Sequence, residues 1–169
     1  MATIPLVSVE DYLLTSYRPD CDYLEGVVRE RHLGQFDHAR LQTILAALFV
    51  NNEGKWGVLG LVEQRLRVRP DRYRVPDLLV VPLDYDRSPV VEIAPLLCIE
   101  IVSPDDRLKD LTERAQDYLD LGVPETWIFD PLKQQAYLYS VDGLHQVPPT
   151  AELHCGRVEL VPAVLFSQL

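Results

Sequence analysis

Two acidic residues lie at apolar segments of the sequence, and together they could bind a divalent metal ion. Asp77 comes directly before the run L-L-V-V, and Glu100 lies within L-C-I-E-I-V. A carboxylate in a buried strand is costly unless a metal or a cation compensates it. Mg²⁺ typically takes one or two carboxylates, and the backbone carbonyl of Ile101 would be a further oxygen ligand. Because such an ion orients a water molecule and offsets charge on a phosphodiester, the pattern points to phosphodiester hydrolysis.

A cation beside these carboxylates would have to come from the helix expected after Glu100. The residue two positions after Glu100 would share its face on a strand, but this residue is Val102, which is chemically inert. Lys109 and Arg114 are therefore the candidate catalytic cations. Arg114 follows Asp110 by four residues, so the two share one helical face.

Each of these observations also has a purely structural explanation. Asp77 follows Pro76 and could simply end a turn. Glu100 could form a buried ion pair with an arginine. Asp110 and Arg114 could be an ordinary surface pair that contributes a few tenths of a kcal/mol, roughly. Pairs of acids occur in many inert sheets, so spacing alone leaves both explanations open.

The segments around these residues predict a mixed α/β domain. The expected helices cover residues 9–15, 37–52 and 107–121. The expected strands cover residues 56–62, 63–69, 77–81, 96–102, 125–130, 135–140 and 157–160, and residues 23–30 form either a strand or a tight hairpin around Gly26. The helix over 107–121 has an apolar stripe of Leu108, Leu111, Ala115, Tyr118 and Leu119. Helices and strands alternate only in part, which predicts a mixed central sheet flanked by helices within one domain of residues 1–169.

Composition and charge narrow the class of protein. The 169 residues carry a formal net charge of −10, which disfavours a plain DNA-binding module because nucleic-acid affinity depends on neutralising phosphates. No apolar run approaches the length of about 20 residues that spans a bilayer, and we expect neither a signal peptide nor a membrane partner. Three cysteines without paired spacing predict a reduced, cytoplasmic protein.

Positive charge is concentrated in the strand predicted for residues 63–69 and just beyond it. Arg65, Arg67 and Arg69 alternate with Gln64, Leu66 and Val68, so the three arginines would share one face of the strand; Arg72 and Arg74 follow. They could contact a nucleic-acid backbone near the carboxylates. A solvated face balanced by acidic neighbours is an equal alternative.

Three further residues have weaker functional interpretations. Glu63 could be a third acidic ligand, although a surface glutamate is the commoner case. His38 lies near a helix N-terminus and could assist at the site, but a capping or packing role is more usual. Tyr118 is interpreted as a core residue.

The chain resembles the Uma-type endonuclease family, which is abundant in cyanobacteria and belongs to the PD-(D/E)XK, or restriction-endonuclease-like, superfamily. The resemblance rests on P-D-L-L-V-V-P, L-C-I-E-I-V-S-P, D-D-R-L-K-D and Y-L-D-L-G-V-P-E-T-W-I-F-D-P, and on D-Y-L-E-G-V-V followed by His38. It implies a restriction-endonuclease-like mixed sheet and a DNA endonuclease that requires Mg²⁺ or Mn²⁺. Asp77 and Glu100 match the family's strand carboxylates. The resemblance also implies a homo-oligomer, with a dimer as the expected state.

Two residues depart from the family pattern. Arg114 stands where the family usually has lysine, and Asp22 stands where it usually has glutamate. Arginine can bind phosphate bidentately, but its pKa is too high for it to accept a proton. One hypothesis is therefore an endonuclease that uses Asp77, Glu100 and Arg114, with Lys109 and Asp22 secondary. The alternative is a catalytically impaired nuclease homologue that acts as a binding or assembly protein.

Overall fold

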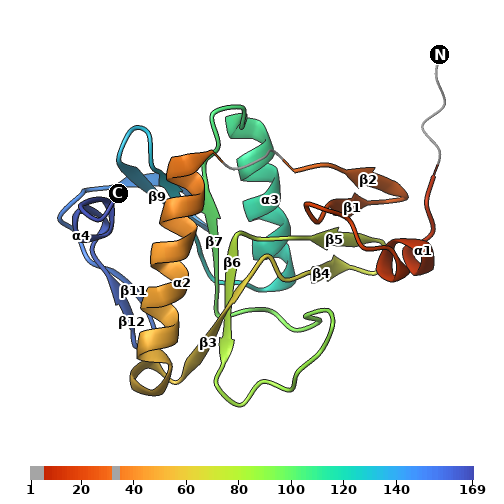
Figure 1. Ribbon diagram of the computed structural model, residues 1–169, viewed down its shortest axis with the longest axis horizontal. Helices are drawn as coiled ribbons and strands as arrows, with labels where there is room; N and C mark the ends of the chain where they lie inside the picture. The colour runs from red at the N-terminus through yellow and green to blue at the C-terminus, as the bar shows by residue number, and fades with distance from the viewer. Residues whose placement is uncertain (1–5, 32–34) are drawn as a thin grey trace.

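A six-stranded mixed sheet forms the centre of the molecule (Figure 1). The structure is a computed structural model that describes residues 6–31 and 35–169. The sheet order is β10-β9-β8-β7-β6-β3, in which β7 and β8 are parallel and the other neighbours are antiparallel. The strands are β3 Val58–Val62, β6 Leu78–Pro82, β7 Leu97–Ile101, β8 Thr126–Asp130, β9 Gln135–Ser140 and β10 Gly143–Val147. The predicted mixed sheet is therefore confirmed.

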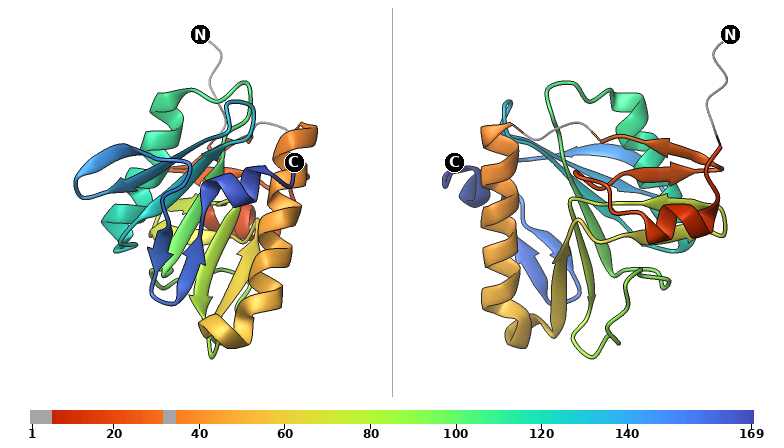
Figure 2. Two further views of the ribbon diagram at one scale, coloured as in Figure 1. Left: turned by 90° about the vertical axis from the view of Figure 1, so that its left-hand side faces the viewer. Right: turned by 45° about the vertical axis from the view of Figure 1, so that its right-hand side comes forward.

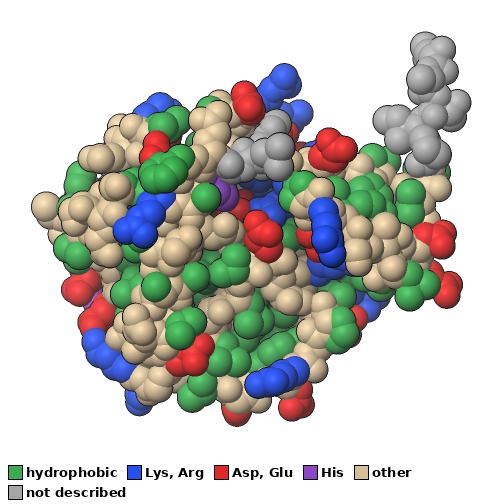
Figure 3. Space-filling view, viewed as in Figure 1, with side chains coloured by type: hydrophobic (Ala, Val, Ile, Leu, Met, Phe, Trp, Pro, Cys, Tyr) green, Lys and Arg blue, Asp and Glu red, His purple; other side chains and the backbone are tan. Residues whose placement is uncertain are grey.

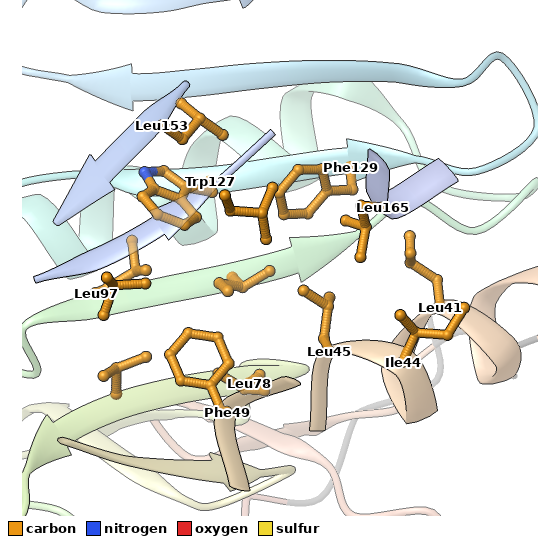
Figure 4. Close-up of a cluster of buried hydrophobic side chains, with 14 of the residues drawn as sticks. Leu41, Ile44, Leu45, Phe49, Leu78, Leu97, Trp127, Phe129, Leu153 and Leu165 are labelled. Atoms are coloured by element: carbon orange, nitrogen blue, oxygen red, sulfur yellow. The ribbon is translucent and has the colours of Figure 1, made fainter. Parts of the chain in front are cut away.

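One face of this sheet packs against helix α2, which spans Phe36–Trp56. The ribbon of β11 (Leu153–Cys155) and β12 (Val158–Leu160) and the short helix α4 (Pro162–Phe166) lie on the same side (Figure 2). In the main core, the apolar side of α2 meets buried residues of β6, β7 and β8 (Figure 4): Leu41, Ile44, Leu45 and Phe49 pack with Leu78, Leu97, Trp127 and Phe129. Burial of this apolar surface holds α2 across the sheet.

The opposite face carries helix α3 (Leu108–Leu121) and a second, four-stranded sheet. That sheet has the order β2-β1-β5-β4, with β1 Asp22–Leu24, β2 Val27–Arg29, β4 Leu66–Arg69 and β5 Arg72–Arg74, and helix α1 (Val9–Leu14) precedes it. Strand alternation separates the two cores. Leu97 and Ile99 enter the core under α2, whereas Cys98 packs with Tyr118 on the other side. Glu100 has the same parity as Cys98, so it lies on the α3 side.

The structure corrects three predicted details. Helix α2 does not stop at residues 51–54 but continues to Trp56, because that side chain is buried against Phe49. It ends at Gly57, whose φ of 72° is left-handed. The strand predicted for residues 63–69 begins only at Leu66, since Glu63 has a φ of 50°. Leu108, predicted to face inward, is 64% exposed.

The remaining predicted elements are present with small boundary shifts. Ser8 accepts a hydrogen bond from the Asp11 amide and caps α1, and Gly122 ends α3 in a left-handed conformation. In the part of the chain that is described, no helix is both long and apolar enough to cross a membrane.

Candidate active site

Asp77 and Glu100 meet at one pocket beside the junction of β6 and β7. Leu78 pairs with Ile99 across these antiparallel strands, so the adjacent Asp77 lies opposite Glu100 in the same register. The backbone N–H of Ile101 donates to Asp77 Oδ2 at 2.7 Å and fixes the aspartate against β7. Both carboxylates are buried, at 2% and 1% exposure. The pocket is lined by Arg31, His38, Asp77, Glu100, Ile101, Ser103, Asp106 and Arg114.

Helix α3 supplies both partners of the Glu100 carboxylate. The Tyr118 hydroxyl donates to Glu100 Oε1 at 2.6 Å, and Arg114 Nε lies 3.1 Å from Oε2. The second contact is an ion pair without a well-aligned hydrogen bond, because among the described residues the Arg114 Nε–H has no acceptor in line. A second nitrogen of Arg114 donates to Asp106 at 3.4 Å. Arg114 therefore lines the pocket, and its guanidinium is paired with Glu100.

Asp77 is paired with a second arginine and with a histidine. Arg31 donates to Asp77 Oδ1, and His38 Nε2 lies 3.4 Å from Oδ2. Burial favours the protonated acid, but the hydrogen bond from His38 and the charge of Arg31 outweigh it and lower the pKa of Asp77. Burial opposes protonation of His38, yet its bond to Asp77 raises the pKa of the imidazole. Asp77 is therefore held as a carboxylate.

The pKa of Glu100 is raised, in contrast to that of Asp77, and its titration should therefore change the stability of the protein with pH. Burial raises the pKa of Glu100 from 4.5 to about 7, against the lowering effect of Arg114. Between these two pH values the folded state binds the proton more tightly than the unfolded state, so stability falls as pH rises. We expect this residue to remove about 3 kcal/mol of unfolding free energy between pH 4.5 and pH 7.

Urea unfolding at pH 5 and pH 8 measures this effect, with Glu100→Gln as the matched variant. The amide cannot titrate, so the wild-type protein should lose more stability over this range than the variant does. His38 contributes in the same direction to both proteins, so the comparison isolates Glu100 together with the part of the His38 pKa shift that the charge of Glu100 causes. An identical pH dependence in the two proteins would show that Glu100 is ionised throughout.

The oxygen donors at the pocket are of the type that suits Mg²⁺ or Mn²⁺. Two carboxylates and a backbone carbonyl, completed by water, are an adequate ligand set for Mg²⁺. Within the described ranges there is no larger group of three or more His, Cys, Asp or Glu side chains suited to a metal. Because each carboxylate already faces an arginine, the donors fit a metal whose binding rearranges at least one ion pair.

Three of the other predicted residues lie apart from the two carboxylates. Lys109 is exposed on α3 and does not line the pocket. Asp22 lies in an adjoining hollow, where both of its oxygens are occupied by Arg74 and by the Val75 amide. Glu63 is largely exposed, and its closest cation, Arg31, is 3.9 Å away. The structure therefore assembles Asp77, Glu100, Ile101 and Arg114, but it does not bring Lys109, Asp22 or Glu63 to them.

The three arginines predicted to bind nucleic acid are also outside this pocket, and each is paired with an acid. Arg65 forms two 2.7 Å contacts with Asp20, Arg67 pairs with Glu92 at 3.2 Å, and Arg69 pairs with Asp117 at 3.3 Å. Their partners lie in different elements, so they do not form one basic surface. On the face of the molecule in Figure 3, basic and acidic side chains are interspersed. The alternative, a solvated strand face whose arginines are balanced by acidic neighbours, describes these residues better.

Three residues of the site were not predicted from the sequence. They are Arg31, Asp106 and Tyr118. Tyr118 carried a signal, since it lies four residues after Arg114 and shares its helical face. Asp106 follows Glu100 closely and accepts a hydrogen bond from the Ser103 amide in the turn before α3, whose N-cap residue is Arg107. Arg31 carried no signal, because it lies 46 residues from Asp77 and only the fold brings them together.

Comparison with known proteins identifies a family and a fold. Residues 9–163 match the family model Uma2, described as "Putative restriction endonuclease". A solved structure from Anabaena variabilis, described as "a putative nuclease belonging to DUF820", aligns with a TM-score of 0.83 and 21% identity over 96% of this chain and 98% of that chain. A DrdV–DNA complex aligns with a TM-score of 0.41 and 12% identity over 73% of this chain and 10% of that chain. No curated protein matches the sequence.

Proposed function

Because this chain belongs to the Uma2 family, we propose that it is a metal-dependent endonuclease that hydrolyses phosphodiester bonds in DNA. The observation that carries the proposal is the meeting of two buried carboxylates, Asp77 and Glu100, with the guanidinium of Arg114 in one pocket. Two carboxylates that can hold a divalent ion, with a cation beside them, form a set suited to the hydrolysis of a phosphodiester. Asp77 directly precedes β6, Glu100 lies in β7 and Arg114 lies in α3, and these elements pack against one another.

The proposed roles follow from the contacts of each residue. Asp77 and Glu100 would hold Mg²⁺ or Mn²⁺ with the carbonyl of Ile101, and the ion would activate a water and offset phosphate charge. Arg114 would offset charge on the scissile phosphate, for which its planar guanidinium is suited. His38 and the Ile101 amide orient Asp77, and Tyr118 orients Glu100.

Incubation of the protein with supercoiled plasmid tests the proposal directly. We expect nicking in Mg²⁺ or Mn²⁺ and none in excess chelator. The assay should be run at low salt, because the net charge of −10 opposes binding to DNA. Intact plasmid with either ion at low salt would contradict the proposal.

Variants of Arg114 test the role of the cation. Arg114→Lys keeps the positive charge and should retain cleavage within about tenfold, whereas Arg114→Ala should lose about 100-fold because the developing charge is no longer offset. Initial nicking rates measure this, with folding of each variant verified by circular dichroism at the assay temperature. Arg157→Ala, which removes an exposed arginine in the turn between β11 and β12, is the charge-matched control. Equal rates for Arg114→Ala and wild type would remove Arg114 from the mechanism.

One observation favours a second candidate function, a catalytically impaired homologue that binds without cleaving. Val102 offers no polar group two residues after Glu100, and both carboxylates are neutralised by arginines. A protein of this kind would retard DNA in a mobility-shift assay with Mg²⁺ and leave it intact. Retardation combined with nicking would exclude this candidate.

A further inference from the structure

Arg31 occupies an unusual place for an arginine. It follows β2 by two residues, yet its side chain is only 13% exposed and turns toward the carboxylates of the pocket. It pairs with Asp77, and its other terminal nitrogen lies 3.9 Å from Glu63. Burial opposes its charge, but Asp77 and Glu100 keep its pKa above the ordinary value. Arg31 is thus a cation held by the two acids proposed to bind the metal.

The pocket has no room for a hydrated metal ion while Arg31 remains in it. Its cavity volume is about 10 Å³, which corresponds to roughly one water molecule. Mg²⁺ bound by two carboxylates usually keeps several waters in its coordination shell. Some side chain must therefore move before the ion and its waters can enter.

The structure offers space for this movement on the other side of Arg31. A hollow of about 290 Å³ adjoins the pocket and shares Arg31 and Arg114 with it. Its walls include the acids Asp22, Glu30 and Asp110 and the arginines Arg29 and Arg74. Asp22 already pairs with Arg74, so Glu30 and Asp110 are the acids that could receive Arg31. A guanidinium that left Asp77 would enter a polar space with acidic groups, so its charge would not be left in an apolar environment.

Arg114 is a less suitable residue to move. It is anchored between Glu100 and Asp106 on a regular helix, and it is buried to the same degree as Arg31. Arg31 lies outside the helices and strands, two residues after the end of β2. Apart from Asp77, the ion pair that Arg31 would give up is the 3.9 Å contact with Glu63, which is longer than the 3.4 Å contact of Arg114 with Asp106.

We propose that Arg31 is a tethered counter-ion that neutralises Asp77 in the metal-free protein and must move into the adjoining hollow when the metal binds. This inference rests on the proposed metal-dependent function. It makes the affinity for metal a competition between the ion and the protein's own guanidinium. The apparent affinity for the metal equals the intrinsic affinity multiplied by the fraction of molecules in which Arg31 has left Asp77.

Calorimetric titration with Mn²⁺ tests the competition. Arg31→Met keeps most of the apolar stem without the charge, and we expect it to bind Mn²⁺ at least about tenfold more tightly than wild type. Arg67→Met loses the same charge at an exposed position paired with Glu92, and it should bind within about twofold of wild type because surface charges are screened.

The outcomes separate this inference from the function on which it rests. Equal Mn²⁺ affinity in wild type and Arg31→Met overturns the role of Arg31 but leaves the nuclease proposal intact. A similar gain in Arg31→Met and Arg67→Met also overturns it, because net charge alone would then explain the effect. Absence of Mn²⁺ binding in all three proteins overturns both proposals.

A second measurement uses the wild-type protein and does not depend on how well Arg31→Met folds. Phenylglyoxal modifies accessible arginines, and peptide mass spectrometry reports the rate at each site. Saturating Mn²⁺ should accelerate the modification of Arg31 severalfold, while Arg67 serves as an internal reference. An unchanged or slower rate at Arg31 in Mn²⁺ would overturn the inference.

Discussion

Asp77→Asn should reduce plasmid cleavage in Mg²⁺ at least about 100-fold, because loss of a direct ligand should exceed the cost, roughly 10- to 100-fold, of losing a residue that only orients a ligand. The amide keeps the shape of the side chain and can still accept the hydrogen bond from the Ile101 amide. It lacks the negative charge that would attract the ion. Initial nicking rates and Mn²⁺ affinity should therefore fall together.

Glu159→Gln is a suitable control for this variant. Glu159 is an exposed acid that pairs with Lys55, far from the pocket in the sequence and on a different strand. The substitution removes the same charge, and the variant should cleave at the wild-type rate. If Asp77→Asn binds Mn²⁺ normally but does not cleave, Asp77 would act on the substrate and not on the metal. If Asp77→Asn binds Mn²⁺ and cleaves the plasmid as the wild type does, the proposed site is wrong.

Much of the fold could be predicted because burial leaves a periodic pattern. The continuous apolar runs around Leu78–Pro82 and Leu97–Ile101 identified the two central strands, and Gly122 marked the end of α3. The end of α2 could not be predicted in the same way. Asn51 and Gly54 are poor helix formers, but packing of Trp56 on Phe49 overrides their local preference.

The site was predictable only where its residues are close in sequence or match a family motif. Asp77 and Glu100 stand out because charge is rare in buried strands, and Arg114 follows at a helical spacing. The partners of an arginine cannot be inferred in this way. Arg65 and Arg67 looked like a basic strand face, yet each reaches an acid from another part of the chain. Pairing over such distances is decided by tertiary structure.

Arg74→Met should reduce the free energy of unfolding by about 3–5 kcal/mol, the usual cost of breaking a buried ion pair from one side. Arg74 is 1% exposed and contacts the carboxylates of Asp22, Asp117 and Glu113 at 2.8, 2.6 and 3.0 Å. Asp117 also pairs with Arg72, so it keeps a counter-ion in the variant. Within residues 6–31 and 35–169, Asp22 then keeps the Val75 amide as its hydrogen-bond partner and has no ion pair, so it becomes a buried carboxylate whose charge is not compensated.

The double variant Arg74→Met/Asp22→Asn decides whether this charge is the cause. The asparagine side chain can still accept from the Val75 amide and carries no charge, so the double variant should recover about 2 kcal/mol relative to additive losses. Urea unfolding of the wild type, the two single variants and the double variant measures this coupling. As a control, Arg67→Met should change the free energy of unfolding by less than about 1 kcal/mol. Strict additivity would mean that Arg74 stabilises by packing alone. Coupling would mean that ion pairs hold the four-stranded sheet onto α3, the helix that places Arg114 and Tyr118 against Glu100.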